Sequence, residues 1–265
     1  MMKKILKARE TTSFLFLAAL FLLVGIINPS FLTLSNISAC FNTSVVYTLI
    51  AVGMAFAIFV GEIDVSVGSN LGLVAAVVGT MIQNGSNWFA AFAVGICIGA
   101  VVGLINGWGV AVMKIPSLIF TLGTNGILRG MMYLQVGVEQ VNQLPKSFKD
   151  ISSMTLVGSF TIYYCCAVLL TLGIHGLLTR TRKGRYFIAV GDNAGGAELV
   201  GIPATRTKVL AYVICGVLSA VAGIIFCSRI GIVTSLSGNG YEMKAVAACV
   251  LGGISLSGGV GSVIG

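Results

Sequence analysis

The sequence predicts an all-α integral membrane protein that crosses the bilayer several times and forms one domain over residues 1–265. Hydrophobic residues make up 57% of the chain and charged residues only 9%, against about 25% in ordinary soluble domains. The mean hydropathy is +1.01, and several apolar runs approach the roughly 20 residues that a helix needs to cross a bilayer. A soluble bundle would need helices with a polar face, and these runs offer almost none.

The first predicted span is TTSFLFLAALFLLVGII, which follows the basic start MMKKILKARE. A secretory signal has the same arrangement, but no small-x-small cleavage site follows, so we expect an uncleaved helix. The later apolar runs are 45–60, 66–82, 88–113, 117–134, 155–178, 209–227 and 245–256. The seven cysteines and the one histidine show no metal-ligand spacing, so we expect neither a metal nor another cofactor.

The distribution of basic residues predicts the orientation in the membrane. We place the N-terminus inside and alternate the side after each span. The other inside segments are then 61–65, 179–208 and the one around Lys114, and the outside segments are 28–44, 83–87, 135–154 and 228–244. The inside then holds Lys3, Lys4, Lys7, Arg9, Lys114, Arg180, Arg182, Lys183, Arg185, Arg206 and Lys208, and the outside only Lys146, Lys149, Arg229 and Lys244. This excess agrees with the positive-inside rule, so the net charge of +8 gives no reason to expect a nucleic-acid partner.

The predicted inside loop 179–208 contains TRTRKGRYFIAVGDNAGGAELVGI, which is unusually polar for this chain. Asp192 or Asn193 is a suitable N-cap, Gly201 a suitable residue after the helix end, and Pro203 stops any continuation. These signals predict a short helix at about 192–200. Two helical turns are not stable alone in water, so we expect the helix to dock on another surface. The alternative is a plain basic loop that contacts anionic membrane lipid.

Two similar glycine-rich segments, GEIDVSVGSNLGL at 61–73 and GGISLSGGVGSVIG at 252–265, predict an internal repeat with broken helices. Repeated transporters use such breaks to line the translocation path. Two long spans follow the first copy and none follows the second within these residues. We therefore expect a fragment, or a short family member, that lacks roughly two or three spans at its C-terminus.

Polar residues near or within the spans are candidates for the translocation path, because an ionised group at membrane depth is costly without a partner. Asp64 has two interpretations: it lies at a helix break on the path, with Ser66 and Ser69 capping the next helix, or it caps a tight cytoplasmic turn. Asn125 and Arg129 share one helix face, and Arg129 either faces inward or extends to the surface. The candidate path residues are Asp64, Ser66, Ser69, Asn125, Arg129, Ser255 and Ser257.

Four motifs resemble, in this order, the permease subunits of bacterial ABC importers for simple sugars, of the ribose type, with relatives for xylose, galactose, inositol and autoinducer-2. They are GEIDVSVGS, KIPSLIFTLGTNGILRG, GRYFIAVGDNAGGAELVGI and GYEMKAVAACVLGGISLSGGVGSVIG, and the resemblance covers about residue 12 to the last residue. It implies a bacterial inner-membrane permease, without enzymatic activity of its own, that imports a ribose-like sugar. The implied partners are a separate ATPase, an extracytoplasmic sugar-binding protein and a second permease copy, identical or not.

The resemblance also implies that the loop helix docks on the ATPase. The residues implied are Arg185, Tyr186, Gly191, Asp192, Asn193, Ala194, Ala197, Glu198 and Gly201. The chain departs from the family at Glu62, where glycine is frequent, and at 194–196, where the helix start is commonly rich in glutamate. A permease for branched-chain amino acids is the nearest alternative on substrate. A self-sufficient secondary transporter that uses Asp64 as a proton or cation site is the alternative on mechanism.

Overall fold

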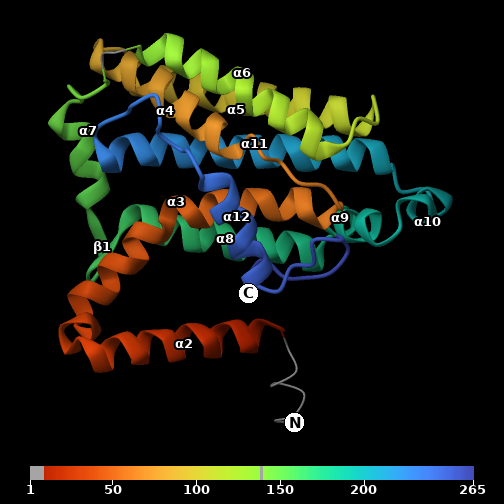
Figure 1. Ribbon diagram of the computed structural model, residues 1–265, viewed down its shortest axis with the longest axis horizontal. Coiled ribbons are helices and arrows are strands. Elements are labelled where there is room, and N and C mark those ends of the chain that lie inside the picture. Colours follow the sequence, from red (N-terminus) through yellow and green to blue (C-terminus); the bar gives the residue numbers. More distant parts are fainter. Residues whose placement is uncertain (1–8, 138–139) are drawn as a thin grey trace.

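The computed structural model describes residues 9–137 and 140–265, with only the backbone of residues 9–12, and these residues are almost entirely helical (Figure 1). Lys3, Lys4 and Lys7, which contribute to the predicted orientation, lie outside the described residues. The long helices are α2 (Arg9–Ile27), α3 (Leu34–Phe59), α4 (Val67–Gln83), α5 (Trp88–Ala111), α6 (Ser117–Val136), α8 (Ile162–Arg180) and α11 (Ala204–Ile230). The shorter helical elements are η1 (Pro29–Leu32), α7 (Lys146–Asp150), η2 (Ile151–Ser153), α9 (Arg182–Asp192), α10 (Ala194–Leu199) and α12 (Tyr241–Leu251).

Four of the described helices, α3, α5, α8 and α11, are long and apolar enough to cross a membrane. The helical segment Ser13–Ile27 and α4 are shorter apolar helices. The only described strands, β1 (Thr155–Val157) and β2 (Phe160–Thr161), form a small antiparallel hairpin. The prediction of an all-α polytopic membrane protein is therefore confirmed.

The helix starts that differ most from the apolar runs are those of α3 and α8. Helix α3 begins at Leu34 rather than near residue 45, and the hydroxyl groups of its polar first half bond within the helix; Ser38 Oγ, for example, donates to the Ser35 carbonyl at 2.9 Å. Helix α8 begins at Ile162 rather than at 155, because residues 155–161 pair as the hairpin and the Thr161 side chain caps the helix. Hydropathy identifies apolar segments, but it does not detect local hydrogen bonds between side chains and the backbone.

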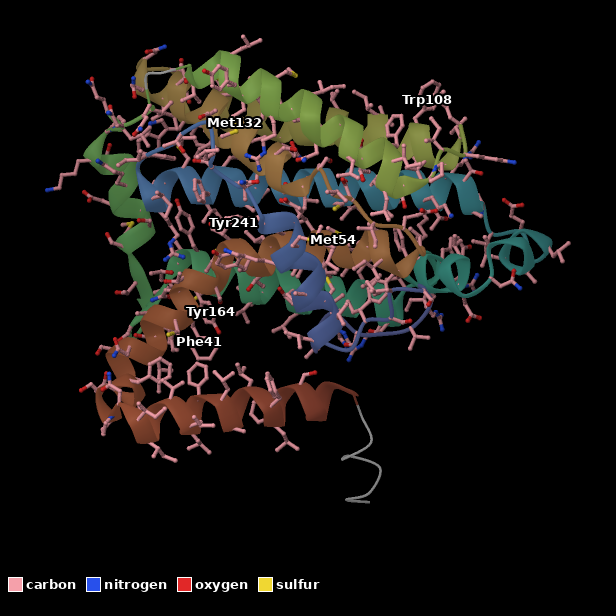
Figure 2. All side chains as sticks on the ribbon, viewed as in Figure 1. Phe41, Met54, Trp108, Met132, Tyr164 and Tyr241 are labelled. Atoms are coloured by element: carbon pink, nitrogen blue, oxygen red, sulfur yellow. The ribbon has the colours of Figure 1, made fainter. Side chains whose placement is uncertain are left out.

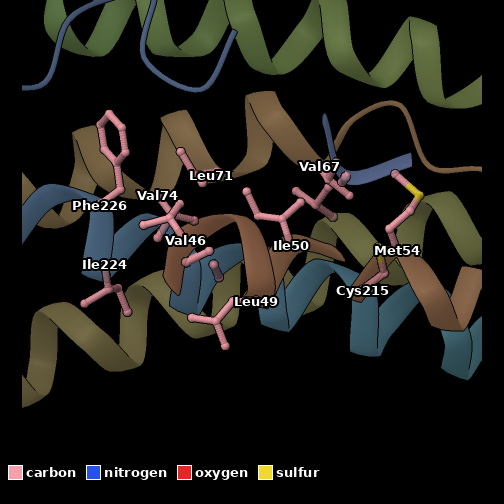
Figure 3. Packing of buried hydrophobic residues seen from close by; sticks show 14 of the residues in the cluster. Val46, Leu49, Ile50, Met54, Val67, Leu71, Val74, Cys215, Ile224 and Phe226 are labelled. Atoms are coloured by element: carbon pink, nitrogen blue, oxygen red, sulfur yellow. The ribbon is translucent and has the colours of Figure 1, made fainter. Parts of the chain in front are cut away.

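Helix α11 lies at the centre of the bundle and packs on α5, α3 and α4. Figure 3 shows the core between them, where Leu49 and Ile50 of α3 meet Leu71 and Val74 of α4 and Ile224 of α11. Helix α2 stands at the edge of the molecule (Figure 1). Most of its large apolar side chains are exposed, as expected for a helix in contact with lipid.

Three glycines of α5 at intervals of four residues, Gly99, Gly103 and Gly107, allow α11 to approach its backbone. A Cβ added to Gly107 would lie 2.8 Å from Val209 Cα, and one added to Gly99 or Gly103 would overlap with carbonyl oxygens of α11. Small residues at this spacing are typical of close helix packing in membranes. The α5–α11 contact is therefore made by backbone against backbone.

The loops fall into two groups at opposite ends of the bundle. At one end, Lys208 Nζ lies 2.5 Å from Glu62 Oε1, which joins the predicted inside segments 61–65 and 179–208. At the other, the backbone of Val141 pairs with that of Val233, which joins the predicted outside segments 135–154 and 228–244. This agrees with the predicted alternation of sides. That the first group faces the cytoplasm stays a prediction.

Candidate functional site

The carboxylate of Asp64 lies in the break between α3 and α4, in a buried polar network. Asp64 is 1% exposed, and it accepts hydrogen bonds from the Ser66 amide at 2.9 Å and the Ser66 hydroxyl at 2.6 Å. The side-chain amide of Asn106, on α5, donates to both carboxylate oxygens at 3.2 and 3.4 Å and to Ser66 Oγ at 2.8 Å. The Asp64 side chain thus caps the turn that precedes α4, through the Ser66 amide, and this turn is buried rather than open to solvent.

The same network reaches α6 through two threonines. Thr124 Oγ1 donates to Asn106 Oδ1 at 2.8 Å, and the Val65 amide donates to Thr121 Oγ1 at 3.1 Å. The network therefore ties the break to both α5 and α6. Sequence reasoning missed Asn106, Thr121 and Thr124, although an asparagine inside the apolar run of α5 is a signal that could have found the first of them.

The predicted capping role of Ser66 and Ser69 is wrong. Ser66 occupies the N-cap position of α4, but its side chain makes no capping hydrogen bond, because its hydroxyl donates to Asp64 instead. Ser69 Oγ donates backward to the Ser66 carbonyl at 2.9 Å. Both serines are fully buried and bond only within the chain.

Asn125 and Arg129 lie one turn apart on α6, and both are partly buried. Arg129 Nη1 donates to the carbonyl oxygen of Ser237, in the segment between α11 and α12, at 2.7 Å. Arg129 therefore bonds to its own chain rather than extending freely to the surface, which agrees with the inward-facing interpretation.

The second glycine-rich motif lies at the same end of the bundle as the first, and the two touch. The Gly259 amide donates to the Phe59 carbonyl at 3.1 Å, and a Cβ added to Gly258 would lie 2.8 Å from the Gly61 amide nitrogen. Gly258 and Gly259 adopt φ values of +83° and +71°, which favour glycine. Ser255 and Ser257 belong to this turn, and neither hydroxyl hydrogen-bonds to the Asp64 network among the described residues.

Helix α9 packs onto this contact between the two motifs through Gly191. A Cβ on Gly191 would overlap with the Phe59 carbonyl oxygen, and one on Gly259 would lie 2.7 Å from Asp192 Cα. Three distant segments thus meet by their backbones. We call this contact, made by Phe59, Gly61, Gly191, Gly258 and Gly259, the glycine junction.

The polar loop forms two helices, where the sequence predicts a basic loop followed by one helix at 192–200. Helix α9 starts after Thr181, whose hydroxyl oxygen accepts from the Gly184 amide at 2.9 Å, and α10 starts after Asn193, whose side chain accepts from the Gly196 amide at 2.8 Å. The loop prediction for residues 182–191 is wrong, because this segment buries Phe187 and Val190 on one helical face. The Asn193 cap is confirmed, and Gly201, at φ +81°, ends the helix as predicted.

The residues predicted to dock on the ATPase divide into an inner and an outer set. Ala197 is 5% exposed and packs against its own chain, and Gly191 lies in the glycine junction. The fully exposed members are Arg185, Asp192, Asn193, Glu198 and Gly201, while Tyr186 and Ala194 are half-buried. Ala197 and Gly191 therefore position the helices by packing against the rest of the chain.

Sequence reasoning missed two exposed apolar residues, the last residue of α10 and the residue that follows it. Leu199 is 90% exposed and Val200 is 76% exposed, and both follow Glu198 at the part of the molecule that projects furthest from the bundle (Figure 1). Such side chains are expected in contact with lipid on a span, but α10 is a short helix of mainly small residues in a polar loop between spans. We call Glu198, Leu199 and Val200 the α10 tip. The signal in the sequence is the Leu-Val pair within a charged loop.

The described residues contain no group of three or more histidine, cysteine, aspartate or glutamate side chains that could hold a metal ion. A groove of about 880 Å³ lies between α5 and α6. Its lining is almost wholly apolar, with residues such as Val101, Ile105 and Ile127. Its chemistry fits hydrocarbon rather than a polar solute.

Comparisons with known proteins give one family. Residues 36–265 match the family described as the branched-chain amino acid transport system permease component. The chain is 42% identical over 264 residues to an autoinducer 2 import system permease protein, LsrC, of Enterobacter sp. (strain 638), a match that covers all of this chain and 77% of the relative. The proteins of the same description from Klebsiella pneumoniae and Yersinia pestis (strain Pestoides F) are 41% and 40% identical, over 76% and 75% of their lengths. Among solved structures, none matches the chain significantly.

Proposed function

Because the chain belongs to the permease component family of branched-chain amino acid transport systems, we propose that it is the membrane permease of an ATP-driven importer for autoinducer-2 or a closely similar sugar. It is a transport component rather than an enzyme, and it lies in the membrane through several spans. The proposed substrate rests on one observation: the whole chain matches, at 40 to 42% identity, proteins described as autoinducer 2 import permeases. Ribose is the second candidate, on the resemblance of the four motifs.

We further propose that the α10 tip docks on a separate cytoplasmic ATPase, which supplies the energy. Leu199 and Val200 are large, apolar and exposed, and the charged Glu198 lies beside them. Such a patch supports burial against a partner, since removing apolar surface from water is favourable by about 25 cal/mol per Å² before the entropic cost of association. The N-terminus and the α10 tip then lie on the cytoplasmic side of a bacterial inner membrane.

The glycine junction supports a route for the movement that the ATPase imposes. Helix α9 ends at Asp192, directly before α10, and its Gly191 touches the ends of both glycine-rich motifs. Backbone contacts deform less than side-chain contacts, because no rotamer change can absorb a displacement. A shift of α10 would therefore move α3 and the 252–265 turn together.

The remaining partners of the proposed importer are a second permease copy and an extracytoplasmic binding protein that delivers the substrate. The path candidates support a pathway shared with the second copy. Asp64, Ser66 and Ser69 are sealed inside the chain, whereas Asn125 and Arg129 lie on α6, which has one side exposed. We propose that Asp64 fixes the helix break and that α6 contributes the path.

Uptake tests the proposed function directly. Cells that lack their own permeases would express this chain with the ATPase and binding protein of an autoinducer 2 import system, and would be offered labelled autoinducer-2, ribose and leucine. We expect uptake of autoinducer-2 that disappears with a hydrolysis-deficient ATPase or without the binding protein. Preferred uptake of leucine would support the branched-chain amino acid alternative. Uptake that an uncoupler abolishes, and that ignores ATP, would support a secondary transporter.

A further inference from the structure

Three buried polar atoms near the Arg129–Ser237 contact lack a partner. Asn125 Oδ1, Arg129 Nη2 and Glu242 Oε2 are all buried, and none has a hydrogen-bond partner among the residues that the structure describes. An unpaired polar atom is costly in a protein interior and more so at membrane depth. Packing within the chain therefore does not account for this cluster.

These groups come from two elements that meet over α4. Asn125 and Arg129 share one face of α6, and the Glu242 carboxylate, in the first turn of α12, interacts electrostatically with Arg129. Glu242 Oε2 also lies against Gly68, because a Cβ there would overlap with it. Glu242 Oε1 accepts only a long hydrogen bond, 3.3 Å, from the Gly240 amide.

The segment 231–240 covers this cluster and lies on the glycine face of α4. A Cβ on Gly72 would lie 2.5 Å from the Ser237 carbonyl and 2.7 Å from Met132 Sδ, and one on Gly238 would overlap with the Gly68 carbonyl. Figure 1 shows this connection, in blue, running beside α4, and Figure 2 labels Met132 on the adjoining turn of α6. Arg129 Nη1 holds the segment through its bond to Ser237.

We propose that Asn125, Arg129 and Glu242 form a binding subsite for a small polyhydroxylated solute, which the segment 231–240 covers in this conformation. The inference rests on the proposed function and adds Glu242 to the path. Two unpaired acceptors and one unpaired donor match hydroxyl groups, since each hydroxyl both donates and accepts. Lifting the segment would also free Arg129 Nη1 from Ser237, which adds a second donor.

An internal ion pair or an amino-acid site at the same residues would behave differently from a polyol subsite. If Arg129 and Glu242 formed only an internal ion pair, exchanging the two charges would leave transport unchanged. They would hold an amino acid if its ammonium group paired with Glu242 and its carboxylate with Arg129. The polyol subsite requires both charges at their present positions and also the neutral acceptor of Asn125.

Uptake kinetics in the reconstituted importer test the subsite, with autoinducer-2 and ribose as probes. The variants are Glu242→Gln, Asn125→Leu and the exchange Arg129→Glu with Glu242→Arg, and the control is Asp150→Asn, which removes an exposed acid on the same end of the molecule. We expect the two single variants to raise the apparent KM by about 10-fold or more, as loss of a hydrogen bond to a charged or buried group does. The exchange variant should transport neither probe, because both charges are reversed at the subsite, and the control should behave as wild type.

Two further measurements separate the outcomes. ATPase activity stimulated by the binding protein shows that each variant assembles, and leucine is tested as a competitor. Three results would each overturn the subsite. They are unchanged KM values in the single variants, wild-type transport by the exchange variant, and competition by leucine. If the wild-type chain transports neither probe, the proposed function itself fails, a result that the variants cannot produce.

Discussion

The backbone of Gly191, in the last turn of α9, lies directly against the carbonyl oxygen of Phe59, the last residue of α3. No side chain separates the two helices at this point. Since the Gly259 amide donates to the same carbonyl at 3.1 Å, the contact also includes the second glycine-rich motif. The loop that we propose to meet the ATPase is thus joined to both motifs by main-chain atoms.

Replacement of Gly191 should damage this junction. We expect Gly191→Ala to lower stability by about 1 to 3 kcal/mol, because the added methyl group must displace packed backbone. The matched control is Gly195→Ala, since a Cβ there meets only Asn193 Oδ1, at 3.6 Å, and should stabilise α10 by up to about 1 kcal/mol. Thermal unfolding in detergent gives the stabilities. Equal midpoints for the two variants would contradict a tight junction.

Charge at the α10 tip should uncouple ATP hydrolysis from uptake. Leu199→Glu leaves the helix exposed as before but removes an apolar contact that we propose for the ATPase, so binding should weaken by about 2 kcal/mol or more. Leu199→Met is the control, because it preserves an apolar side chain. The measurement is co-purification of the ATPase together with uptake in vesicles. Full uptake by Leu199→Glu would remove the tip from the interface.

Substitution of Ala197 is a weaker test of docking than the sequence suggests. Ala197 is 5% exposed, so Ala197→Trp should displace α10 rather than block the partner. We expect α9 and α10 to unfold locally in this variant, because overpacking should destabilise them by about 1 to 3 kcal/mol. Glu198→Arg, on an exposed side chain, should reduce coupling without affecting stability. Limited proteolysis of the 182–201 segment distinguishes the two, with faster cleavage expected only in Ala197→Trp.

The Asp64 network should behave as one unit. Asp64→Ala leaves the amide and the hydroxyl of Ser66 without an acceptor, which should cost about 1 to 3 kcal/mol for each buried group, and the side-chain nitrogen of Asn106 keeps only its bond to Ser66 Oγ. Asn106→Ala removes a partner of the same carboxylate. The double variant should therefore lose clearly less stability than the sum of the two single losses. Additive losses in thermal unfolding would show that the two residues act independently.

Close packing of α5 on α11 gives a prediction about assembly. Gly103→Leu places a large side chain against the Tyr212 backbone, so we expect the chain to fold poorly and to be degraded. Gly173→Leu is the control, since a Cβ at Gly173 meets nothing within 4 Å. The amount of each variant in the membrane fraction measures the effect. Comparable amounts would mean that α5 and α11 can separate without penalty.

Several features were predictable from the sequence because their causes are local. The apolar runs mark the helices that cross the membrane, the side chain of Asn193 marks the start of α10, and Gly201 marks its end. Helix α9 was not predicted, since its apolar face becomes meaningful only when Phe187 and Val190 have something to pack against. The exposure of Leu199 was not predicted either, because hydropathy alone would bury it, although the Leu-Val pair within a charged loop is a signal for it.

The fold class, the alternation of loops between two ends and the two glycine-rich breaks can be predicted from the chain alone, since hydropathy, charge and backbone freedom act over a few residues. Which breaks and side chains meet depends on the packing of the helices. Asp64 accepts hydrogen bonds from Asn106, 42 residues away. The Phe59 carbonyl accepts a hydrogen bond from the Gly259 amide and lies against the backbone of Gly191. Such contacts depend on how whole helices pack, because each requires the backbones of distant segments to approach within a few ångströms.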